Sequence, residues 1–232
     1  MLANAWDAIT AKNVEAAGFP AVATTSAGVA IALGFEDHHK TPPDEMFAAV
    51  ARIATAVDVP VTADLEGGYG LGADELVERM LDAGVVGLNF EDTDHAAGGD
   101  SMVDPNKQAT RIADLRQAAR RAGVDIVINA RTDAYIHGVP DPLDASLERG
   151  RLYLGSGADC VFPIVVTDEL EIERFAREFA RVNVLFMPGS PDLARLAQLG
   201  VARISMGGGL AHASFAAHKQ MLERVRGGQA YW

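Results

Sequence analysis

Two carboxylates and a run of glycine end an apolar stretch in the segment TADLEGGYG, residues 62–70. Side chains at positions i and i+2 of a strand point to the same side, so Asp64 and Glu66 should lie next to each other. Neighbouring buried carboxylates repel each other and stay ionised only when a cation compensates them. The glycines let the backbone turn tightly without side chains that would fill the site. The pattern therefore predicts a cation site where this strand ends.

Further acids follow other apolar runs and extend the same prediction. Asp37 lies beyond the run that ends in TTS, and Glu91 ends the run GLNFE. With Asp64 and Glu66 they would offer only oxygen ligands, which suit Mg²⁺ or Mn²⁺ better than Zn²⁺. Any one of these acids could instead cap a helix or face solvent.

A candidate anion site accompanies the acids. Arg131 follows the apolar run IVINA, so its guanidinium could offer a carboxylate or phosphonate two parallel hydrogen bonds. It could equally pair with Asp133 to brace the loop. Thr25 and residues 26–28 follow another apolar run, where backbone N–H groups at the start of a helix could bind an anion. The alternative for this segment is an ordinary capped turn.

The elements that must position these residues alternate along the chain. Helical stretches that end in a small residue and Gly are followed by short Val- and Ile-rich runs, as in AAGFPAVATTS and RAGVDIVINAR. The expected strands lie near residues 1–4, 21–25, 59–64, 85–91, 125–130, 159–163, 182–187 and 202–206. The expected helices lie near residues 7–17, 44–57, 73–83, 107–122, 143–156, 168–180, 191–199 and 211–227.

Eight such repeats predict a closed (β/α)8 TIM barrel that forms one domain over residues 1–232. In this fold the active site lies at the C-terminal ends of the strands, where the acids and Arg131 are expected. The alternative is an open doubly wound sheet. That fold usually carries a Gly-rich phosphate loop after its first strand, and the segment SAGVAIALG does not match it.

Composition narrows the classes of partner and compartment. The formal net charge of −12 argues against nucleic acid, whose phosphates need clustered Lys and Arg. No apolar stretch approaches the ~20 residues that span a bilayer, and no signal peptide is visible, so we expect no membrane partner. Cys160 is the single cysteine, which excludes an intrachain disulfide and fits the cytoplasm. We expect Cys160 to be a core residue and His38, His39, His137 and His218 to be solvated.

Five segments together resemble the isocitrate lyase/phosphoenolpyruvate mutase superfamily. They are NAWDA (4–8), TTSAGVA with LGFED (24–37), ADLEGGYG (63–70), GLNFED (87–92) and INARTD (128–133), within a match from residue 4 to about 218. The resemblance implies a (β/α)8 barrel whose last helix is often swapped between subunits, and hence a homodimer or homotetramer. It also implies Mg²⁺ and a 2-oxo acid, or its enolate, as the bound species.

The resemblance also implies roles for individual residues. Asp64 matches the direct metal ligand, whereas Asp37, Glu66 and Glu91 match acids that hold the metal largely through water. Arg131 matches an arginine that contacts the oxygens of the substrate. The predicted substrate-binding residues are Trp6, Thr25, Ser26, Ala27, Gly28, Asp64, Arg131 and His212. The predicted catalytic residues are Arg131, His95 and Glu91. Trp6 could line the pocket or only pack beneath the loop.

Three departures from the family pattern concern the reaction. The loop at 93–107 has no cysteine, although lyases use a loop cysteine as acid and base, and it has no lysine before Lys107. Ile164 stands where lyases place a glutamate, and His212 falls near a lyase arginine. His95 and Asp100 become the loop candidates for proton transfer, because an imidazole titrates near neutral pH.

The sequence therefore predicts a Mg²⁺-dependent enzyme that binds a 2-oxo acid or 2-oxo dicarboxylate. It would act on an adjacent C–C or C–P bond as a lyase, decarboxylase or hydrolase, without a cysteine acid or base. Negligible cleavage of isocitrate and 2-methylisocitrate is expected. The alternative is a barrel that binds 2-oxo acids with little or no turnover, as a sensor or diverged relative.

Overall fold

The computed structural model describes residues 1–232 and contains a ring of eight parallel strands. They are β1 (Ala3–Ala5), β2 (Val22–Thr24), β3 (Val61–Asp64), β4 (Gly87–Glu91), β5 (Val127–Thr132), β6 (Cys160–Pro163), β7 (Asn183–Leu185) and β8 (Arg203–Ser205). Strands β1 to β6 form one sheet in chain order, and β7 pairs with β8. Parallel bridges from Leu2 to Ser205 and from Val161 to Val182 join the two sheets at both seams. The ring is therefore closed, and the predicted barrel is confirmed.

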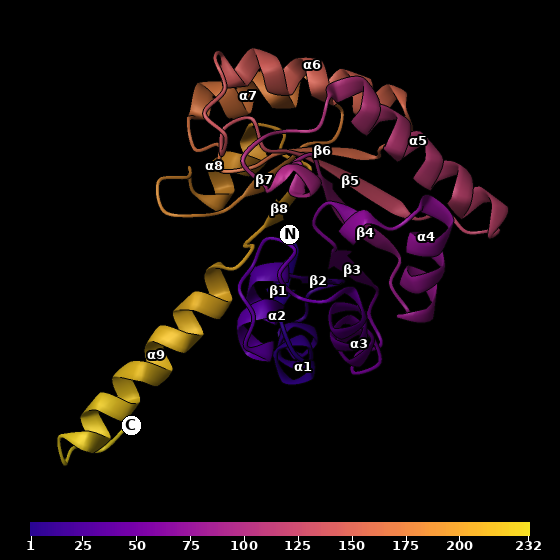
Figure 1. Ribbon diagram of the computed structural model, residues 1–232. Coiled ribbons are helices and arrows are strands. Elements are labelled where there is room, and N and C mark those ends of the chain that lie inside the picture. Colours follow the sequence, from indigo (N-terminus) through magenta and orange to yellow (C-terminus); the bar gives the residue numbers. More distant parts are fainter.

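Helices lie around the outside of the ring, except for the last one, which extends away from it (Figure 1). They are α1 (Ala8–Ala16), α2 (Ser26–Leu33), α3 (Pro43–Ala54), α4 (Ala73–Asp82), α5 (Pro105–Arg121), α6 (Pro142–Gly155), α7 (Glu169–Glu178), α8 (Leu193–Gln198) and α9 (Gly209–Arg226). Two short 3₁₀ turns, η1 (Gly68–Gly70) and η2 (His95–Ala97), lie after β3 and β4. None of the helices is both long and apolar enough to cross a membrane.

Helix α2 is the one α-helix absent from the expected helix ranges, although a helix start was considered at residues 26–28. Its sequence, SAGVAIAL, is apolar almost throughout, so it has no polar face from which a helical period could be recognised. The side chain of Thr25 caps its first turn, and Gly34, with φ of 86°, ends it. This helix brings residues 26–28 to the end of β2, at the mouth of the barrel.

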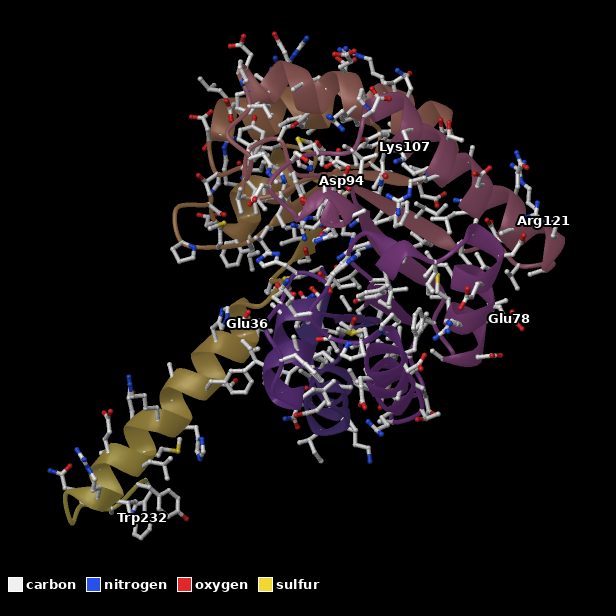
Figure 2. The ribbon with its side chains drawn as sticks, viewed as in Figure 1. Glu36, Glu78, Asp94, Lys107, Arg121 and Trp232 are labelled. Carbon is white, nitrogen blue, oxygen red and sulfur yellow. The ribbon has the colours of Figure 1, made fainter.

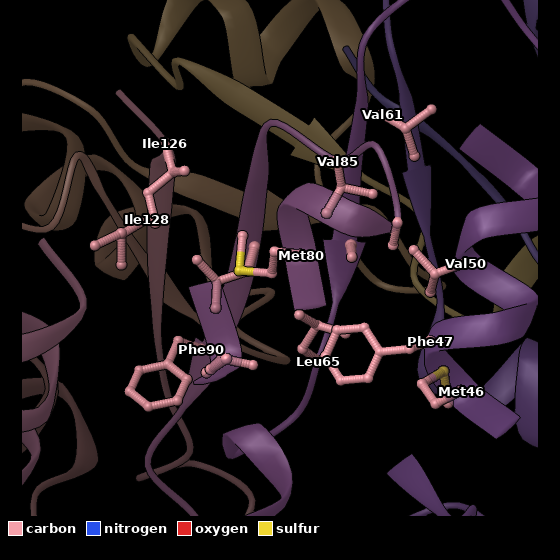
Figure 3. Close-up of a cluster of buried hydrophobic side chains, with 14 of the residues drawn as sticks. Met46, Phe47, Val50, Val61, Leu65, Met80, Val85, Phe90, Ile126 and Ile128 are labelled. Carbon is pink, nitrogen blue, oxygen red and sulfur yellow. The ribbon is translucent and has the colours of Figure 1, made fainter. Parts of the chain in front are cut away.

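A cluster of buried hydrophobic side chains between the strands and the outer helices fixes the strand ends (Figure 3). Leu65 is fully buried in the same cluster as Met46 and Phe47 of α3. Because successive side chains of a strand alternate between its faces, the burial of Leu65 on the outside directs Asp64 to the inside. Glu66, with φ of 50°, follows in the left-handed region, where the chain leaves the strand.

The last helix, α9, extends away from the barrel (Figure 1), and the chain then turns back so that Trp232 lies beside its last turns (Figure 2). Near its start Phe215 contacts Trp6 edge-on, with ring centroids 5.8 Å apart. Farther along, large apolar side chains are exposed, namely Met221, Leu222, Val225, Tyr231 and Trp232. Exchange of this helix between subunits stays a prediction.

Candidate active site

Asp64 is held at the end of β3 by the first residue of α2. Its Oδ2 accepts hydrogen bonds from the backbone N–H of Ser26 at 3.1 Å and from the Ser26 hydroxyl at 3.0 Å. Its Oδ1 lies 3.4 Å from the amide nitrogen of Asn89. The N–H of Gly28 donates to the hydroxyl of Thr25 at 3.5 Å. Two of the three N–H groups that were expected to bind an anion therefore have partners within the protein.

Asn89 links Asp64 to the interior of the barrel. Its Oδ1 accepts hydrogen bonds from Asn129 at 2.8 Å and from Arg203 at 3.2 Å. Two donors on Oδ1 leave the amide nitrogen of Asn89 to face Asp64, so the orientation of this amide is fixed. Burial lowers the pKa of the Arg203 guanidinium, whose Nε has no hydrogen-bond partner.

Glu66 is buried, and the pKa of its carboxyl group is raised. Its Oε2 accepts a hydrogen bond of 2.6 Å from the backbone N–H of His39, and its Oε1 accepts one of 3.0 Å from the hydroxyl of Tyr69. Burial, followed by the charges of Glu91 and Asp37, raises the pKa of Glu66 to about 8. The carboxylates are thus close enough to repel, as the sequence predicted, and Glu66 gains its charge at neutral pH only if a cation offsets this repulsion.

Glu91 and Arg131 form an ion pair above the barrel. Oε2 of Glu91 lies 2.7 Å from Nη1 of Arg131, and Nε of Arg131 donates to Asp133 at 2.6 Å. Burial raises the pKa of Glu91, while Arg131 opposes that change. The sequence offered two alternatives for Arg131, a position at the barrel mouth or a pairing with Asp133. The structure has both at once.

Asp37 completes the acidic set from the segment between α2 and α3. Its Oδ1 is shielded from solvent and has no hydrogen-bond partner. Asp37 and Asp64 line one cavity, and both raise the pKa of Glu66. A buried carboxylate oxygen without a partner is costly unless a cation or a donor occupies the space beside it. The donor set, which consists of oxygen atoms, fits Mg²⁺ or Mn²⁺.

A second group of possible ligands, His39, Glu66 and His95, has donor atoms within 4.8 Å of one another. The two imidazole rings are stacked, with centroids 3.7 Å apart and planes 17° apart. Ring-nitrogen lone pairs lie in the ring plane, so those of stacked rings run side by side and do not converge on one ion. One ring nitrogen of His39 already accepts from the N–H of Gly67, and Nε2 of His95 is engaged with Glu91. The geometry therefore favours the carboxylate set.

The mouth of the barrel contains a cavity of about 210 Å³. Five of the predicted substrate-binding residues line it, namely Thr25, Ser26, Ala27, Asp64 and Arg131. Trp6, Gly28 and His212 are not among its lining residues. Trp6 is buried in the hydrophobic cluster, and His212 is exposed on the first turn of α9. A Cβ on Gly28 would lie 2.9 Å from Cβ of Trp6, so glycine permits this close packing.

The loop after β4 folds over the acids. Thr93 and Met102 pair across it in an antiparallel bridge, and the side chain of His95 is buried, with Nε2 2.6 Å from Oε1 of Glu91. Asp100 is exposed, so of the two expected loop candidates only His95 reaches the carboxylates.

Two histidines correct the expectation of solvated rings. His39 is half-buried between Tyr69 and His95, and burial lowers its pKa to about 3. Nε2 of His137 lies 2.9 Å from the hydroxyl of Thr93. The expectation failed because these contacts join separate loops, and no local sequence pattern shows them.

The sequence analysis missed a buried polar network around Asp92. This network holds Asp133, the partner of Arg131, in place. Asp92 accepts hydrogen bonds from the Tyr153 hydroxyl at 2.6 Å, from Arg149 at 3.0 Å and from the N–H of Asp133 at 2.9 Å. Burial raises the pKa of Asp92 to about 6. The position of Asp92 beside Glu91 was the only signal, because its partners lie far away in the sequence.

The closed parallel barrel has its acidic, arginine-containing cavity at the C-terminal strand ends, where barrel enzymes have their active sites. The model of the phosphoenolpyruvate phosphomutase family matches residues 1–226. The chain therefore belongs to this family and to the isocitrate lyase/phosphoenolpyruvate mutase superfamily. This confirms the resemblance seen in the sequence.

Three similar proteins illustrate the relationship. A crystal structure of a candidate phosphonomutase from Burkholderia cenocepacia J2315 has a TM-score of 0.86 and 40% identity, covering 97% of this chain and 92% of that one. A crystal structure of 2,3-dimethylmalate lyase has a TM-score of 0.84 and 26% identity, covering 97% and 82%. The 2-methylisocitrate lyase of Escherichia coli strain K12 is 31% identical over 70% of this chain, which spans 56% of the length of that lyase.

Proposed function

We propose that the protein is a Mg²⁺- or Mn²⁺-dependent enzyme that binds a 2-oxo acid or its enolate. It acts on an adjacent C–C or C–P bond, as a lyase, decarboxylase or hydrolase. The observation that carries the proposal is the gathering of Asp37, Asp64, Glu66 and Glu91 beside Arg131 at one barrel mouth. Membership of a superfamily that contains lyases and mutases supports it.

Asp64 would hold the cation directly, and the other three acids would hold it largely through water. Bound there, Mg²⁺ or Mn²⁺ would stabilise the negative charge that develops on an enolate oxygen in the transition state. The unpartnered Oδ1 of Asp37 and the raised pKa of Glu66 support this assignment, since a cation beside them would satisfy the first and offset the repulsion that contributes to the second.

The protein's own residues would bind and orient the substrate. Arg131, fixed by Glu91 and Asp133, would donate hydrogen bonds to the oxygens of the 2-oxo acid. Ser26 and Ala27 line the same cavity and would contact the substrate carboxylate.

His95 is the residue in the loop that can move a proton. Its ring nitrogen contacts Glu91, so Glu91 would fix the orientation of the imidazole, which lies beside the acids but does not itself line the cavity. No thiol takes this role, because burial raises the pKa of Cys160 to about 12 on a different strand.

The test combines a binding arm with a turnover arm. Calorimetry with oxalate, a stable dianion shaped like the enolate of pyruvate, should give Mg²⁺-dependent binding that the matched variant Asp64→Asn abolishes. The turnover arm presents oxaloacetate, phosphonopyruvate, 2-methylisocitrate and 4-hydroxy-2-oxopentanoate, and follows pyruvate, oxalate and phosphate above the rate without protein. Product from one of the 2-oxo acids supports an enzyme, whereas binding without product supports the sensor alternative. Absence of Mg²⁺-dependent oxalate binding contradicts the proposed site.

A further inference from the structure

The cavity at the barrel mouth has two chemically different halves. Its polar half comes from the ends of β1 to β5 and is formed by Asn4, Thr25, Ser26, Asp64, Asn89 and Arg131. Its other half is largely apolar and comes from the segment after β5 and from β6 and β7, with Ile136, Phe162, Ile164 and Leu185; Ser205 of β8 lies next to Leu185. A ligand that fills both halves must therefore be amphipathic.

The apolar wall is a built feature of the fold. Phe162 is buried within β6, and Ile164 and Leu185 are partly shielded at the cavity. The residue after Ile164 is Val165, whose φ of 58° lies in the left-handed region that β-branched residues rarely adopt. The backbone N–H of Ile164 donates to the carbonyl of Thr132 at 3.3 Å. This strained turn fixes the point where the chain leaves β6, and with it the position of Ile164.

No cation in the cavity lining is free for a second anionic group, and the buried Arg203 lies behind Asn89, outside the lining. Arg131 is the one guanidinium in the lining, and it is already paired with both Glu91 and Asp133. His38 also lines the cavity but is an exposed residue at its rim. A carboxylate placed against Phe162, Ile164 and Leu185 would be desolvated without a partner.

We infer that the ligand is a 2-oxo monocarboxylic acid with a short apolar tail, whose tail packs against Ile164 and whose head faces Asp64. This inference rests on the proposed function, because the head is assigned to the cation and Arg131. The small volume of about 210 Å³ restricts the tail to a few carbon atoms. A second carboxylate at the end of the tail should weaken binding.

The test uses two stable ligands that differ only at the terminal group. 2-Oxopentanoate carries a methyl group where 2-oxoglutarate carries a carboxylate, and calorimetry in the presence of Mg²⁺ measures both affinities. Burial of a methyl group in place of an unpaired charge should favour 2-oxopentanoate at least about tenfold. Ile164→Lys, which adds an ammonium to the apolar wall, should reverse the preference. The matched control Ile9→Lys, at an exposed position on α1, should leave both affinities unchanged.

Oxalate separates the failure of this inference from the failure of the proposed function. Oxalate has the polar head without a tail, so the wild type should bind it in the presence of Mg²⁺ whether or not the apolar wall recognises a tail. If oxalate binds and 2-oxoglutarate is bound as tightly as 2-oxopentanoate by the wild type, the apolar-tail inference is wrong. Binding of oxalate with no binding of either five-carbon acid also overturns it. Failure to bind oxalate contradicts the proposed function instead.

Discussion

Glu66 should make the affinity for Mg²⁺ strongly dependent on pH. Its pKa is raised to about 8 by burial and by the neighbouring acids, so in the metal-free protein at pH 7 it is about nine-tenths protonated. A cation in the acidic cluster favours the ionised form, and binding should therefore release close to one proton. If the protonated form cannot bind Mg²⁺, lowering the pH from 8 to 6 weakens apparent affinity about 50-fold. Contact through water would reduce the factor, so we expect at least about tenfold.

The sign of the stability effect follows from the same pKa. The pKa of Glu66 is higher in the folded protein than in the unfolded chain. In the metal-free protein, protonated Glu66 therefore contributes its full stabilisation below about pH 4.5. It should lose stability as the pH rises toward 8, by up to about 1.4 kcal/mol per unit for this one group. Saturating Mg²⁺ should oppose that loss.

The assay is calorimetric titration of Mg²⁺ at pH 6, 7 and 8, in buffers of different ionisation enthalpy that count the released protons. Glu66→Gln is the matched control, because it keeps the shape of the side chain and removes its titration. The variant should bind more weakly at pH 8, with a smaller change between pH 8 and pH 6. Equal affinity of the wild type at pH 6 and pH 8, with no proton release, would refute the reasoning.

Four further outcomes are expected. Asp64→Ala should abolish Mg²⁺ binding in calorimetry while Glu66→Gln only weakens it at pH 8; equal affinity of wild type and Asp64→Ala would show that the ligand assignment is wrong. His95→Ala should lower the turnover of an accepted 2-oxo acid with little change in its affinity, so a change in binding alone would contradict a role in proton transfer. Iodoacetamide should not inactivate the enzyme, since burial raises the pKa of Cys160 to about 12; inactivation that substrate prevents would overturn this. Light scattering should detect a dimer or tetramer at micromolar concentration, because α9 exposes several large apolar side chains, and a monomer would argue against helix exchange.

The barrel was predictable because each repeat carries its own local signal. Gly18, Gly84, Gly123, Gly157 and Gly200 all have positive φ and were expected at helix exits, so each marks the approach to the next strand. The extent of helix α2 was not predicted, because a nearly uniform apolar segment has no helical period.

The acids of the candidate site were visible from the sequence because they follow strands at a shared end of the fold. Their partners were less visible. His39 comes within reach of Glu66 only through the folding of the segment after α2, and Arg149 and Tyr153 reach Asp92 across 57 and 61 residues of chain. Such pairs follow from the closure of the barrel, which no local pattern encodes. The place of Trp6 against α9 also depends on packing between the two ends of the chain.

The measurement that tests the central claim most directly is electron paramagnetic resonance of Mn²⁺ bound to the protein, with spin-echo modulation to detect nearby nitrogen. We predict one bound Mn²⁺ per chain, a spectrum that changes when oxalate is added, and no direct coupling to histidine nitrogen. Binding should disappear in Asp64→Asn and persist in His39→Ala. Strong nitrogen modulation, or unchanged Mn²⁺ binding in Asp64→Asn, would contradict a metal site built from the carboxylates at the barrel mouth.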